Sequence, residues 1–472
     1  MNSLYRKILS FIVLSLPVSI CCAQQASVDD LKCDYLANPL GIDNVHPRLM
    51  WQIEDGRPNI AHMAYQIIVG TDSLDVLKGK GNNWQTSRIK LSNNLVVYQG
   101  KHLQPFTKYY WRVSSWLNAD KSIVSSVASF ETGMLSESNW KGFWISDGQD
   151  INLKPAPYFR KLFTTEKKIK SARAYITAAG LYELYINGKK IGDHRLDPAY
   201  TRFDRRTLYV TYDVTQNLQA GKNAIGVLLG NGWYNFQSKA VWDYERAPWR
   251  NRPAFCLDVR ITYEDGSVET ISSDESWKTS LGPIVFNSIY TGEHYDARLE
   301  QLGWNKVNFD DSKWKNVVYR KAPGENISAQ SMQPIRNVQE IKPISMQRMN
   351  DSTYVYNLGR NIAGVTQVTL NGDSGTTVRV IHAEFLDKSG YPDQSNVDYF
   401  LANDTRSYDP FGTDIYILNG KGSETFMPHF NYKGFQYIEV KADRPISLNR
   451  EDIVDYFMRS DVARVGNITC SN

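Results

Sequence analysis

Residues 181–234 read LYELYINGKKIGDHRLDPAYTRFDRRTLYVTYDVTQNLQAGKNAIGVLLGNGWY, in which short alternating runs are separated by turn residues. Asn187-Gly188 follows the run at 181–186, and Asn-Gly tolerates the positive φ angles that a tight β-hairpin needs at both positions. The runs at 206–212 and 223–229 also have the character of strands. This stretch therefore predicts antiparallel β structure.

The stretch ends in Gly230-Asn231-Gly232-Trp233-Tyr234, which places glycines beside two large aromatic residues at the end of a strand. Loops on a rigid sandwich often carry binding residues, and aromatic faces suit the C–H faces of a sugar ring. Asn231, Trp233 and Tyr234 are therefore candidate carbohydrate-binding residues. The alternative is that Trp233 and Tyr234 belong to the core, where both residue types are often largely buried.

The composition favours a large all-β protein. The 472 residues are enough for about three domains of ordinary size, and the chain contains 28 Tyr, 12 Trp and 31 Gly. The net charge is only +4, and no run of Lys and Arg marks a nucleic-acid-binding stripe. We therefore expect no nucleic acid as a partner.

The N-terminus has the pattern of a secretory signal peptide. Two basic residues precede a short apolar run at 8–20, and small residues precede an expected cleavage site after Ala23. The run is too short for a transmembrane segment, and no other apolar run approaches that length. We expect residues 1–23 to be removed and the mature protein to be secreted or periplasmic. Lipoprotein anchoring through Cys21 or Cys22 is the alternative.

Three cysteines remain after that cleavage, Cys33, Cys256 and Cys470. An odd number at wide spacing does not make a disulfide framework, and no Cys/His spacing fits a zinc site. We predict that all three are buried as small apolar residues.

The first domain is predicted at 26–135. Its most specific pattern is Leu103-x-Pro105-x-Thr107-x-Tyr109, which is typical of the tyrosine corner of fibronectin type III sandwiches. In that corner the Tyr hydroxyl hydrogen-bonds to backbone just upstream. Trp51 stands where such a domain has its early core tryptophan. We assign this domain no chemistry.

The second domain is predicted at 140–334. Glu264-Asp265-Gly266 joins two of its strands as a hairpin turn, and Glu293, Asp296 and Arg298 form a charged cluster. Glu293 and Asp296 are candidate ligands for sugar hydroxyls or a bound cation. The alternative is that an Arg–carboxylate pair pins a long loop.

The third domain is predicted at 336–458. We expect strands at 365–370, 377–385 and 435–440, and a hairpin in which 415–418 pairs with 424–427. His382 and Glu384 would share one face of the second strand. The glycines at 359–364 lack the order of a phosphate-binding loop that opens a helix.

These strings, taken in order, resemble the N-terminal region of bacterial α-L-rhamnosidases, a family of glycoside hydrolases. The most specific is Ile289-Tyr290-x-Gly-Glu-x-Tyr-Asp-Ala-Arg at 289–298. The others are YELYING at 182–188, YDVT at 212–215, GNGWY at 230–234, NLGRN at 357–361, HAE at 382–384 and PHFNYKGFQY at 428–437. The resemblance extends from about 31 to 459.

The resemblance implies three consecutive β-sandwich domains, one like fibronectin type III and two rhamnosidase-type, jelly-roll-like sandwiches. It implies hydrolysis of terminal α-L-rhamnose with inversion, by carboxylates in an α/α barrel that follows the β domains. Residues 459–472 would then begin the linker to that barrel. We therefore expect the non-catalytic N-terminal part of the enzyme, which would pack against the barrel, and place no catalytic residue on this chain. Glu384 beside His382 has the residue types of an acid–base pair, but the resemblance places catalysis elsewhere.

The second domain also resembles the family's carbohydrate-binding sandwich, which can bind rhamnose together with calcium. A rhamnose-containing glycan or glycoside is the expected partner, no cofactor is required, and calcium is expected only in this domain. Two other functions stay open. One is a stand-alone glycan-binding or adhesion protein, and the other is the N-terminal region of a different exo-glycosidase.

Overall fold

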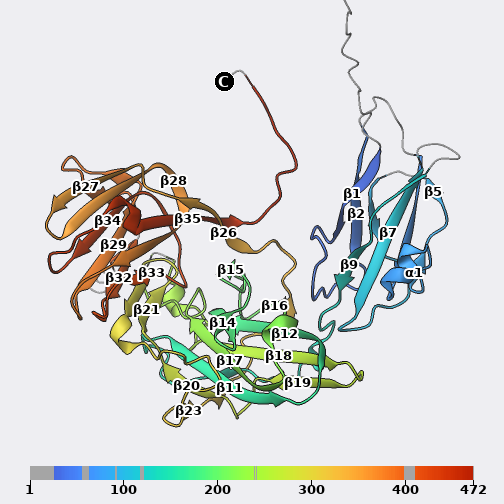
Figure 1. Cartoon of the computed structure of the whole chain (residues 1–472), viewed down its shortest axis with the longest axis horizontal. Coiled ribbons are helices and arrows are strands. Elements are labelled where there is room, and N and C mark those ends of the chain that lie inside the picture. The colour runs from blue at the N-terminus through green and yellow to red at the C-terminus, as the bar shows by residue number, and fades with distance from the viewer. Residues whose placement is uncertain are drawn as a thin grey trace, which may run out of the picture. The chain divides into compact units, whose positions relative to one another are not determined.

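The computed structural model describes residues 26–55, 63–90, 93–116, 122–238, 240, 242–397 and 410–470 (Figure 1). In these residues the secondary structure is β apart from one short α-helix, α1 (Ser73–Leu77), and a few 3-10 turns. The predicted all-β class is thus confirmed. The predicted signal peptide lies outside the described residues. Within the described part of the chain, no helix has both the length and the apolarity needed to cross a membrane.

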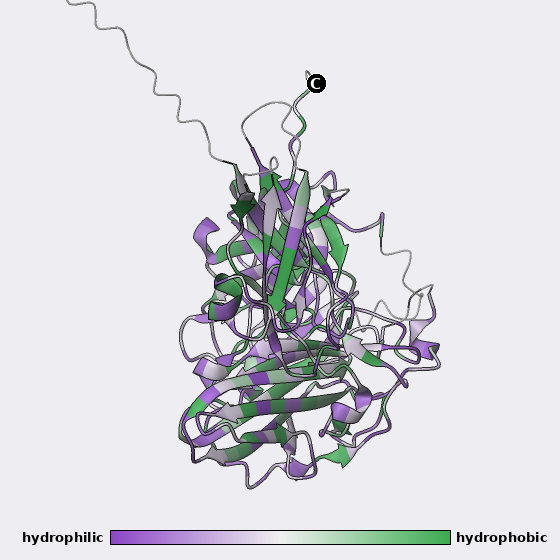
Figure 2. Ribbon diagram, turned by 90° about the vertical axis from the view of Figure 1, so that its right-hand side faces the viewer, coloured by the Kyte–Doolittle hydropathy of each residue, from purple (hydrophilic) through white to green (hydrophobic). Residues whose placement is uncertain are grey.

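The chain forms two compact units. The first comprises Met1–Ala37, Arg48–Lys101 and Tyr110–Ala128, and the second comprises Asn38–Pro47, His102–Tyr109 and Ser129–Asn472. Hydrophobic and hydrophilic residues alternate along many strands, as expected where one face of a strand is buried (Figure 2).

The strands of the first unit form two sheets. One has the order β1–β2–β6, and in the other β3 pairs with β4, β5 and β7, and β7 pairs with β8. The strands are β1 (Ser27–Cys33), β2 (Arg48–Glu54), β3 (Ala64–Gly70), β4 (Trp84–Gln85), β5 (Ile89–Lys90), β6 (Leu95–Val97), β7 (Lys108–Trp116) and β8 (Ser122–Val124). Trp51 and Trp111 are buried here, so the predicted position of the early core tryptophan is confirmed.

The tyrosine corner is present at Tyr109. The backbone N–H of Gln104 donates a hydrogen bond of 2.8 Å to the Tyr109 hydroxyl. The Tyr109 ring stacks against Phe130 with the ring centroids 5.2 Å apart. The Leu-x-Pro-x-Thr-x-Tyr pattern thus predicted this local contact correctly.

Two facing sheets form the second sandwich. Their orders are β24–β10–β18–β12–β16–β25, with β19 on β18, and β14–β13–β17–β11–β20–β23. The main strands are β11 (Pro157–Thr165), β12 (Ile169–Ala179), β13 (Leu181–Ile186), β14 (Lys189–Lys190), β16 (Thr207–Asp213), β17 (Gly221–Gly230), β18 (Ala254–Tyr263), β19 (Val268–Ser272) and β20 (Lys278–Leu281). The shorter strands are β10 (Ile145–Ser146), β23 (Lys315–Asn316), β24 (Val318–Tyr319) and β25 (Ile327–Ala329). Buried side chains of both sheets pack into one core.

The predicted Asn187-Gly188 hairpin is present between β13 and β14. Asn187 has φ of 50° and Gly188 has φ of 86°, and Ile186 pairs with Lys189. Positive φ at both central positions is the geometry for which Asn-Gly is suited.

One eleven-stranded sheet builds the third domain. Its order is β15–β26–β35–β28–β34–β29–β32–β22–β21, with β27 and β33 also on β28. The strands are β15 (His194–Arg195), β21 (Ile284–Ser288), β22 (Gly292–Asp296), β26 (Ile335–Ile341), β27 (Ser345–Asn350), β28 (Thr353–Leu370), β29 (Thr377–Ala383), β32 (Thr413–Ile417), β33 (Glu424–Phe426), β34 (Lys433–Ala442) and β35 (Ile453–Ser460). The register of β28 on β34 shifts between Asn357 and Ile362. Further along, β28 pairs with β35 and β33, and a second core packs within this sheet.

The sheet includes strands from the sequence predicted as the second domain. β21 and β22 form a hairpin, and β22 runs parallel to β32 with His294 opposite Ile415. The predicted boundary near 334 therefore divides the sequence but does not divide the sheet.

Two local predictions are wrong. β32 pairs with β29 and β22, and β33 pairs with β28, so 415–418 and 424–427 do not form a hairpin. Instead, the Glu424 carboxylate accepts hydrogen bonds of 2.9 Å from the N–H groups of Asn419 and Gly420, which closes the turn without a ladder. Cys33 and Cys256 are buried as predicted, whereas Cys470 is exposed.

Candidate functional site

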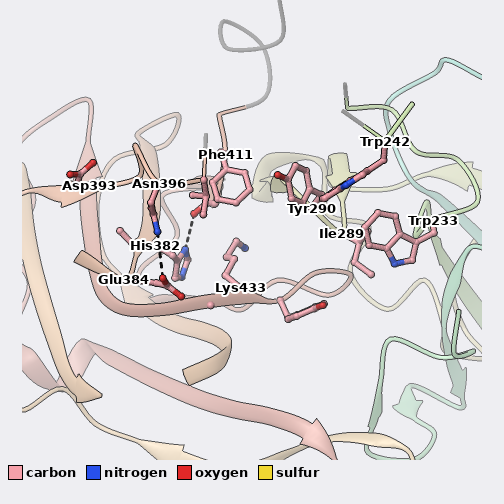
Figure 3. A pocket seen from close by; sticks show the side chains of 15 residues that line it. Trp233, Trp242, Ile289, Tyr290, His382, Glu384, Asp393, Asn396, Phe411 and Lys433 are labelled. Atoms are coloured by element: carbon pink, nitrogen blue, oxygen red, sulfur yellow. Dashed lines mark hydrogen bonds between the residues drawn. The ribbon is translucent and has the colours of Figure 1, made fainter. Parts of the chain in front are cut away.

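A cavity of about 370 Å³ lies where the second sandwich meets the eleven-stranded sheet. Several separate parts of the chain line it. Trp233 and Trp242 follow β17, Tyr290 lies in the turn between β21 and β22, and His382 and Lys433 come from β29 and β34. Figure 3 shows the aromatic residues on one side of this space and the polar residues on the other.

The aromatic side is a continuous series of ring contacts. The ring centroids of Trp242 and Tyr290 are 4.8 Å apart and those of Tyr290 and Phe411 are 5.0 Å apart, both edge-to-face. The ring centroids of Trp233 and Trp242 are 6.3 Å apart. Trp242 is 47% exposed, which is unusual for so large an apolar side chain and favours a surface that receives a ligand.

Three polar residues, Glu384, Asp393 and Asn396, line the other side. Asn396 Nδ2 is 3.5 Å from Glu384 Oε2, at the outer limit of a hydrogen bond. Hydrogen bonds from the backbone and side chain of Ser395 lower the pKa of Asp393. Asp393 is therefore ionised at neutral pH.

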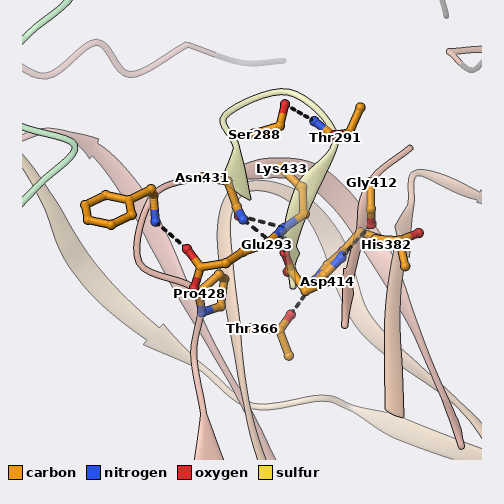
Figure 4. Close-up of polar contacts among 12 residues, drawn as sticks. Ser288, Thr291, Glu293, Thr366, His382, Gly412, Asp414, Pro428, Asn431 and Lys433 are labelled. Atoms are coloured by element: carbon orange, nitrogen blue, oxygen red, sulfur yellow. Dashed lines mark hydrogen bonds and ion pairs between the residues drawn. The ribbon is translucent and has the colours of Figure 1, made fainter. Parts of the chain in front are cut away.

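The base of the cavity contains a buried ion pair (Figure 4). The Lys433 ammonium donates to Asp414 and to Asn431 Oδ1, the latter at 2.6 Å. Asp414 also accepts from the backbone N–H of Glu293 at 2.8 Å. Burial lowers the pKa of Lys433, and Asp414 opposes that shift. The lysine charge is thus compensated inside the protein, as a buried charge requires.

His382 is fixed by two hydrogen bonds. Nδ1 lies 3.0 Å from the carbonyl oxygen of Gly412, and Nε2 lies 2.9 Å from Thr366 Oγ1. Burial lowers the pKa of His382 to about 4, so the ring is neutral at pH 7. A neutral ring that donates from Nδ1 to the carbonyl must accept at Nε2 from the Thr366 hydroxyl.

Asp455 continues this chain of hydrogen bonds. Its Oδ1 is 2.5 Å from Thr366 Oγ1, and its Oδ2 has no partner. Burial raises the pKa of Asp455 to about 7. If His382 Nδ1 donates to Gly412, then Thr366 donates to His382 and a protonated Asp455 donates to Thr366, which gives the hydroxyl and both ring nitrogens a partner and leaves only Asp455 Oδ2 without one. His382 is therefore occupied by this chain and does not form an acid–base pair with Glu384.

The structure does not bring the five predicted sugar-binding residues together. Trp233 lines the cavity. Tyr234 is 5% exposed and packs in a core cluster with Phe203 and Cys256, so the core alternative holds for it. Asn231 is buried, and its Nδ2 donates to the Asn287 carbonyl at 2.9 Å, which joins the end of β17 to β21.

The two predicted carboxylate ligands are also structural. Glu293 is completely buried and accepts from the backbone N–H groups of His429 and Phe430. Asp296 binds the Arg298 guanidinium at 2.7 and 2.8 Å, which is the loop-pinning pair of the alternative interpretation. Since the protein already saturates both carboxylates, neither is available to the cavity.

The carboxylates of the second domain do not fit the calcium expected there. In the described ranges, no group of three or more His, Cys, Asp or Glu side chains is placed to hold a metal ion. Calcium prefers several oxygen ligands, usually including carboxylates. We therefore assign no step to calcium.

Sequence reasoning missed Trp242, Tyr290 and Gly434 as lining residues and treated Glu384 only as a possible catalyst. Trp242 lies in the segment KAVWDYER at 239–246, which showed no motif in the sequence. Tyr290 lies in the family motif at 289–298, and nothing in the sequence indicated a role for it beyond that motif.

Three family models match the chain in succession. The model described as Rha78A-like, N-terminal immunoglobulin domain matches residues 28–136. The Alpha-L-rhamnosidase N-terminal domain matches 167–339. The Bacterial alpha-L-rhamnosidase concanavalin-like domain matches 347–459.

Whole-chain relatives carry the same name. An alpha-L-rhamnosidase of Formosa agariphila is 31% identical over 99% of this chain and 52% of its own length. One from an Alteromonas species is 30% identical over 98% of this chain and 51% of its own length. The chain thus spans about half the length of the curated relatives it matches.

Solved structures agree. An α-L-rhamnosidase from Dictyoglumus thermophilum has a TM-score of 0.85 at 39% identity, over 94% of this chain and 50% of that one. The enzyme from Aspergillus terreus has a TM-score of 0.81 at 30% identity, over 95% and 50%. The Streptomyces avermitilis enzyme, solved with L-rhamnose, supports the fold alone, with a TM-score of 0.84 at 23% identity over 93% and 58%. The chain therefore belongs to the bacterial α-L-rhamnosidase family and carries the β domains of its N-terminal region.

Proposed function

We propose that this chain is the non-catalytic N-terminal part of a secreted α-L-rhamnosidase. The whole enzyme would hydrolyse terminal α-L-rhamnose from glycans or glycosides with inversion of configuration. The observation that three rhamnosidase domain families match in succession, along most of the chain, carries this proposal. The relatives named alpha-L-rhamnosidase, which are 30–31% identical to this chain, support the choice of sugar.

The carboxyl groups support a catalytic site elsewhere. An inverting glycosidase needs an acid and a base about 6.5–9.5 Å apart on either side of the bond. Asp455 has a pKa in the range of an acid catalyst, at about 7, but it is completely buried beneath Thr366. Asp393 lines the cavity, but its lowered pKa keeps it from donating a proton. We propose that the catalytic pair lies in the α/α barrel that the family resemblance implies.

The test is hydrolysis of p-nitrophenyl α-L-rhamnoside. The purified chain should show no turnover above buffer, whereas a longer product of the same locus should release p-nitrophenol. Clear turnover by the chain alone would place catalysis within it. In that case Glu384→Gln and Asp393→Asn should be assayed first, because these two carboxylates line the cavity.

Export is the second part of the proposal. The signal at 1–23 should direct secretion or transfer to the periplasm. N-terminal sequencing of the exported protein should begin at Gln24. A lipid-modified Cys21 or Cys22 would replace secretion by membrane anchoring.

A further inference from the structure

We infer that the cavity between the second sandwich and the eleven-stranded sheet binds a neutral pyranoside and rejects sugar acids. The inference rests on the proposed function only in its choice of L-rhamnose as the first ligand to try. The site itself follows from four features of the cavity: its size, its aromatic side, the glycine in its wall and its charge.

The size and walls suit a sugar. Its volume of about 370 Å³ falls near the lower end of the range of roughly 300–1,000 Å³ for small-molecule sites. Trp242, Tyr290 and Phe411 give one side several ring surfaces in mutual contact. The C–H face of a pyranose can pack on such rings while its hydroxyls point to the opposite side.

Gly434 leaves one wall of the cavity without a side chain. It lies in β34, where its partner is Ala363, and it lines the cavity. A Cβ at this position would find only Glu384 Oε1 within 4 Å, at 3.6 Å. A glycine inside a strand weakens packing, and it often marks a close approach of backbone and ligand. Here the missing side chain leaves open space directly beside the Glu384 carboxylate.

The charge of the lining selects against acids. Among the described lining residues, Glu384 and Asp393 are acidic, and the lysine, Lys433, is paired with Asp414. The carboxylates can accept hydrogen bonds from sugar hydroxyls. A uronic acid would instead bring a like charge into a partly buried space, which costs binding energy.

Calorimetry on the purified chain tests the inference. Methyl α-L-rhamnopyranoside and methyl β-D-glucopyranoside serve as neutral probes, and D-galacturonate serves as the acid. We expect at least one neutral glycoside to bind with a millimolar Kd and galacturonate to bind at least tenfold more weakly. Glu384→Gln should reduce the ratio between the Kd of galacturonate and the Kd of the neutral glycoside, because it removes a negative charge and keeps the shape of the side chain.

Two variants should remove the site. Gly434→Val adds a side chain to the wall beside Glu384, and Trp242→Ala removes an exposed ring, so each should weaken binding at least tenfold. Gly466→Val is the matched control, since a Cβ there meets nothing within 4 Å and the residue is exposed. Glu340→Gln on β26 is the control for Glu384→Gln, because Glu340 is exposed. If circular dichroism shows that Gly434→Val does not fold, the binding measured for Trp242→Ala decides whether the cavity is the site.

The outcomes separate the two proposals. No heat from either neutral glycoside at millimolar concentration overturns the inference, as does unchanged binding in a folded Gly434→Val or Trp242→Ala variant. Binding of galacturonate equal to that of the neutral probes overturns the selectivity. Glucoside binding without rhamnoside binding supports the cavity and counts against rhamnose as its ligand. The hydrolysis assay decides the parent activity independently of all of these.

Discussion

Asp455, Thr366 and His382 show how burial sets protonation at the scale of single residues. An acid whose folded pKa is raised binds a proton in the native state that the unfolded state releases. For Asp455 this window runs from its ordinary value of 3.8 to about 7. Across that window this residue makes the protein less stable as the pH rises. His382 contributes in the opposite direction, because its pKa is lowered from 6.5 to about 4 and its contribution to stability is lost as the pH falls.

Asp455→Asn separates the contribution of Asp455 ionisation from the rest of the pH dependence of stability. The amide can still donate to Thr366 but cannot ionise, so the variant should gain stability over the wild type as the pH rises from 4 to 7. The gain should level off above pH 7, at about 4 kcal/mol at most. Thermal midpoints of both proteins from pH 4 to 8 measure it. Since His382 is common to both, a difference that does not change with pH would mean that Asp455 is already ionised in the fold.

At the scale of elements, the turns at 187–188 and 419–422 show what a sequence can and cannot predict. Asn187-Gly188 was readable from the sequence because its requirement is local: both residues have positive φ. At 419–422 the turn was predicted but the pairing of its flanking strands was wrong, because they pair with β29, β22 and β28 rather than with each other. Local chemistry predicts a turn, but the partner of a strand depends on contacts distant in sequence.

Gly188→Ala tests the first turn. Gly188 has φ of 86°, and an L-residue in the left-handed region costs roughly 1–2 kcal/mol. The added Cβ would also lie 3.0 Å from Lys306 Cγ, a flexible side chain that can move. We expect a lowered thermal midpoint with no change of fold. Gly466→Ala, which has open space around it, should leave the midpoint unchanged, and equal midpoints for all three proteins would contradict the assignment.

Glu424→Gln tests the second turn. The carboxylate accepts from the N–H groups of Asn419 and Gly420 with different oxygens and from the Tyr416 hydroxyl. The amide would place a donor against one of these donors, at a cost of about 1–3 kcal/mol for an unmade buried hydrogen bond. Hydrogen exchange at Asn419 and Gly420 should speed up. The exposed Glu340→Gln should leave both sites protected, and unchanged exchange in Glu424→Gln would show that the turn does not depend on the carboxylate.

At the scale of the whole molecule, the sequence predicted most of the elements and few of their assembly contacts. The all-β class, the tyrosine corner at Tyr109 and the strands around 181–234 all follow from alternation and turn chemistry. The cavity does not, because Trp242, Tyr290 and Gly434 become neighbours only when the sandwiches pack. The burial of Glu293 could not be predicted for the same reason, because the sequence shows no sign of the His429 and Phe430 N–H groups that it accepts from. The Asp296–Arg298 pair, by contrast, agrees with the loop-pinning alternative.

The second sandwich and the eleven-stranded sheet should fold as one cooperative body, because Ile284 of β21 packs in one cluster with Tyr158 of the sandwich and Val365 of the sheet. β22 covers the edge of β32, where Tyr295 stacks on Tyr416 with ring centroids 5.6 Å apart. A fragment of residues 336–460, cut at the sequence boundary, would expose that edge and lose the Glu293 contacts to His429 and Phe430. Exposed edge strands promote aggregation. We expect this fragment to aggregate or to lack a cooperative thermal transition, whereas a fragment of 284–460, which keeps the hairpin, should be more soluble. Size-exclusion chromatography and thermal unfolding of the two fragments provide the comparison, and equal solubility with equal midpoints would show that the hairpin is dispensable to the sheet.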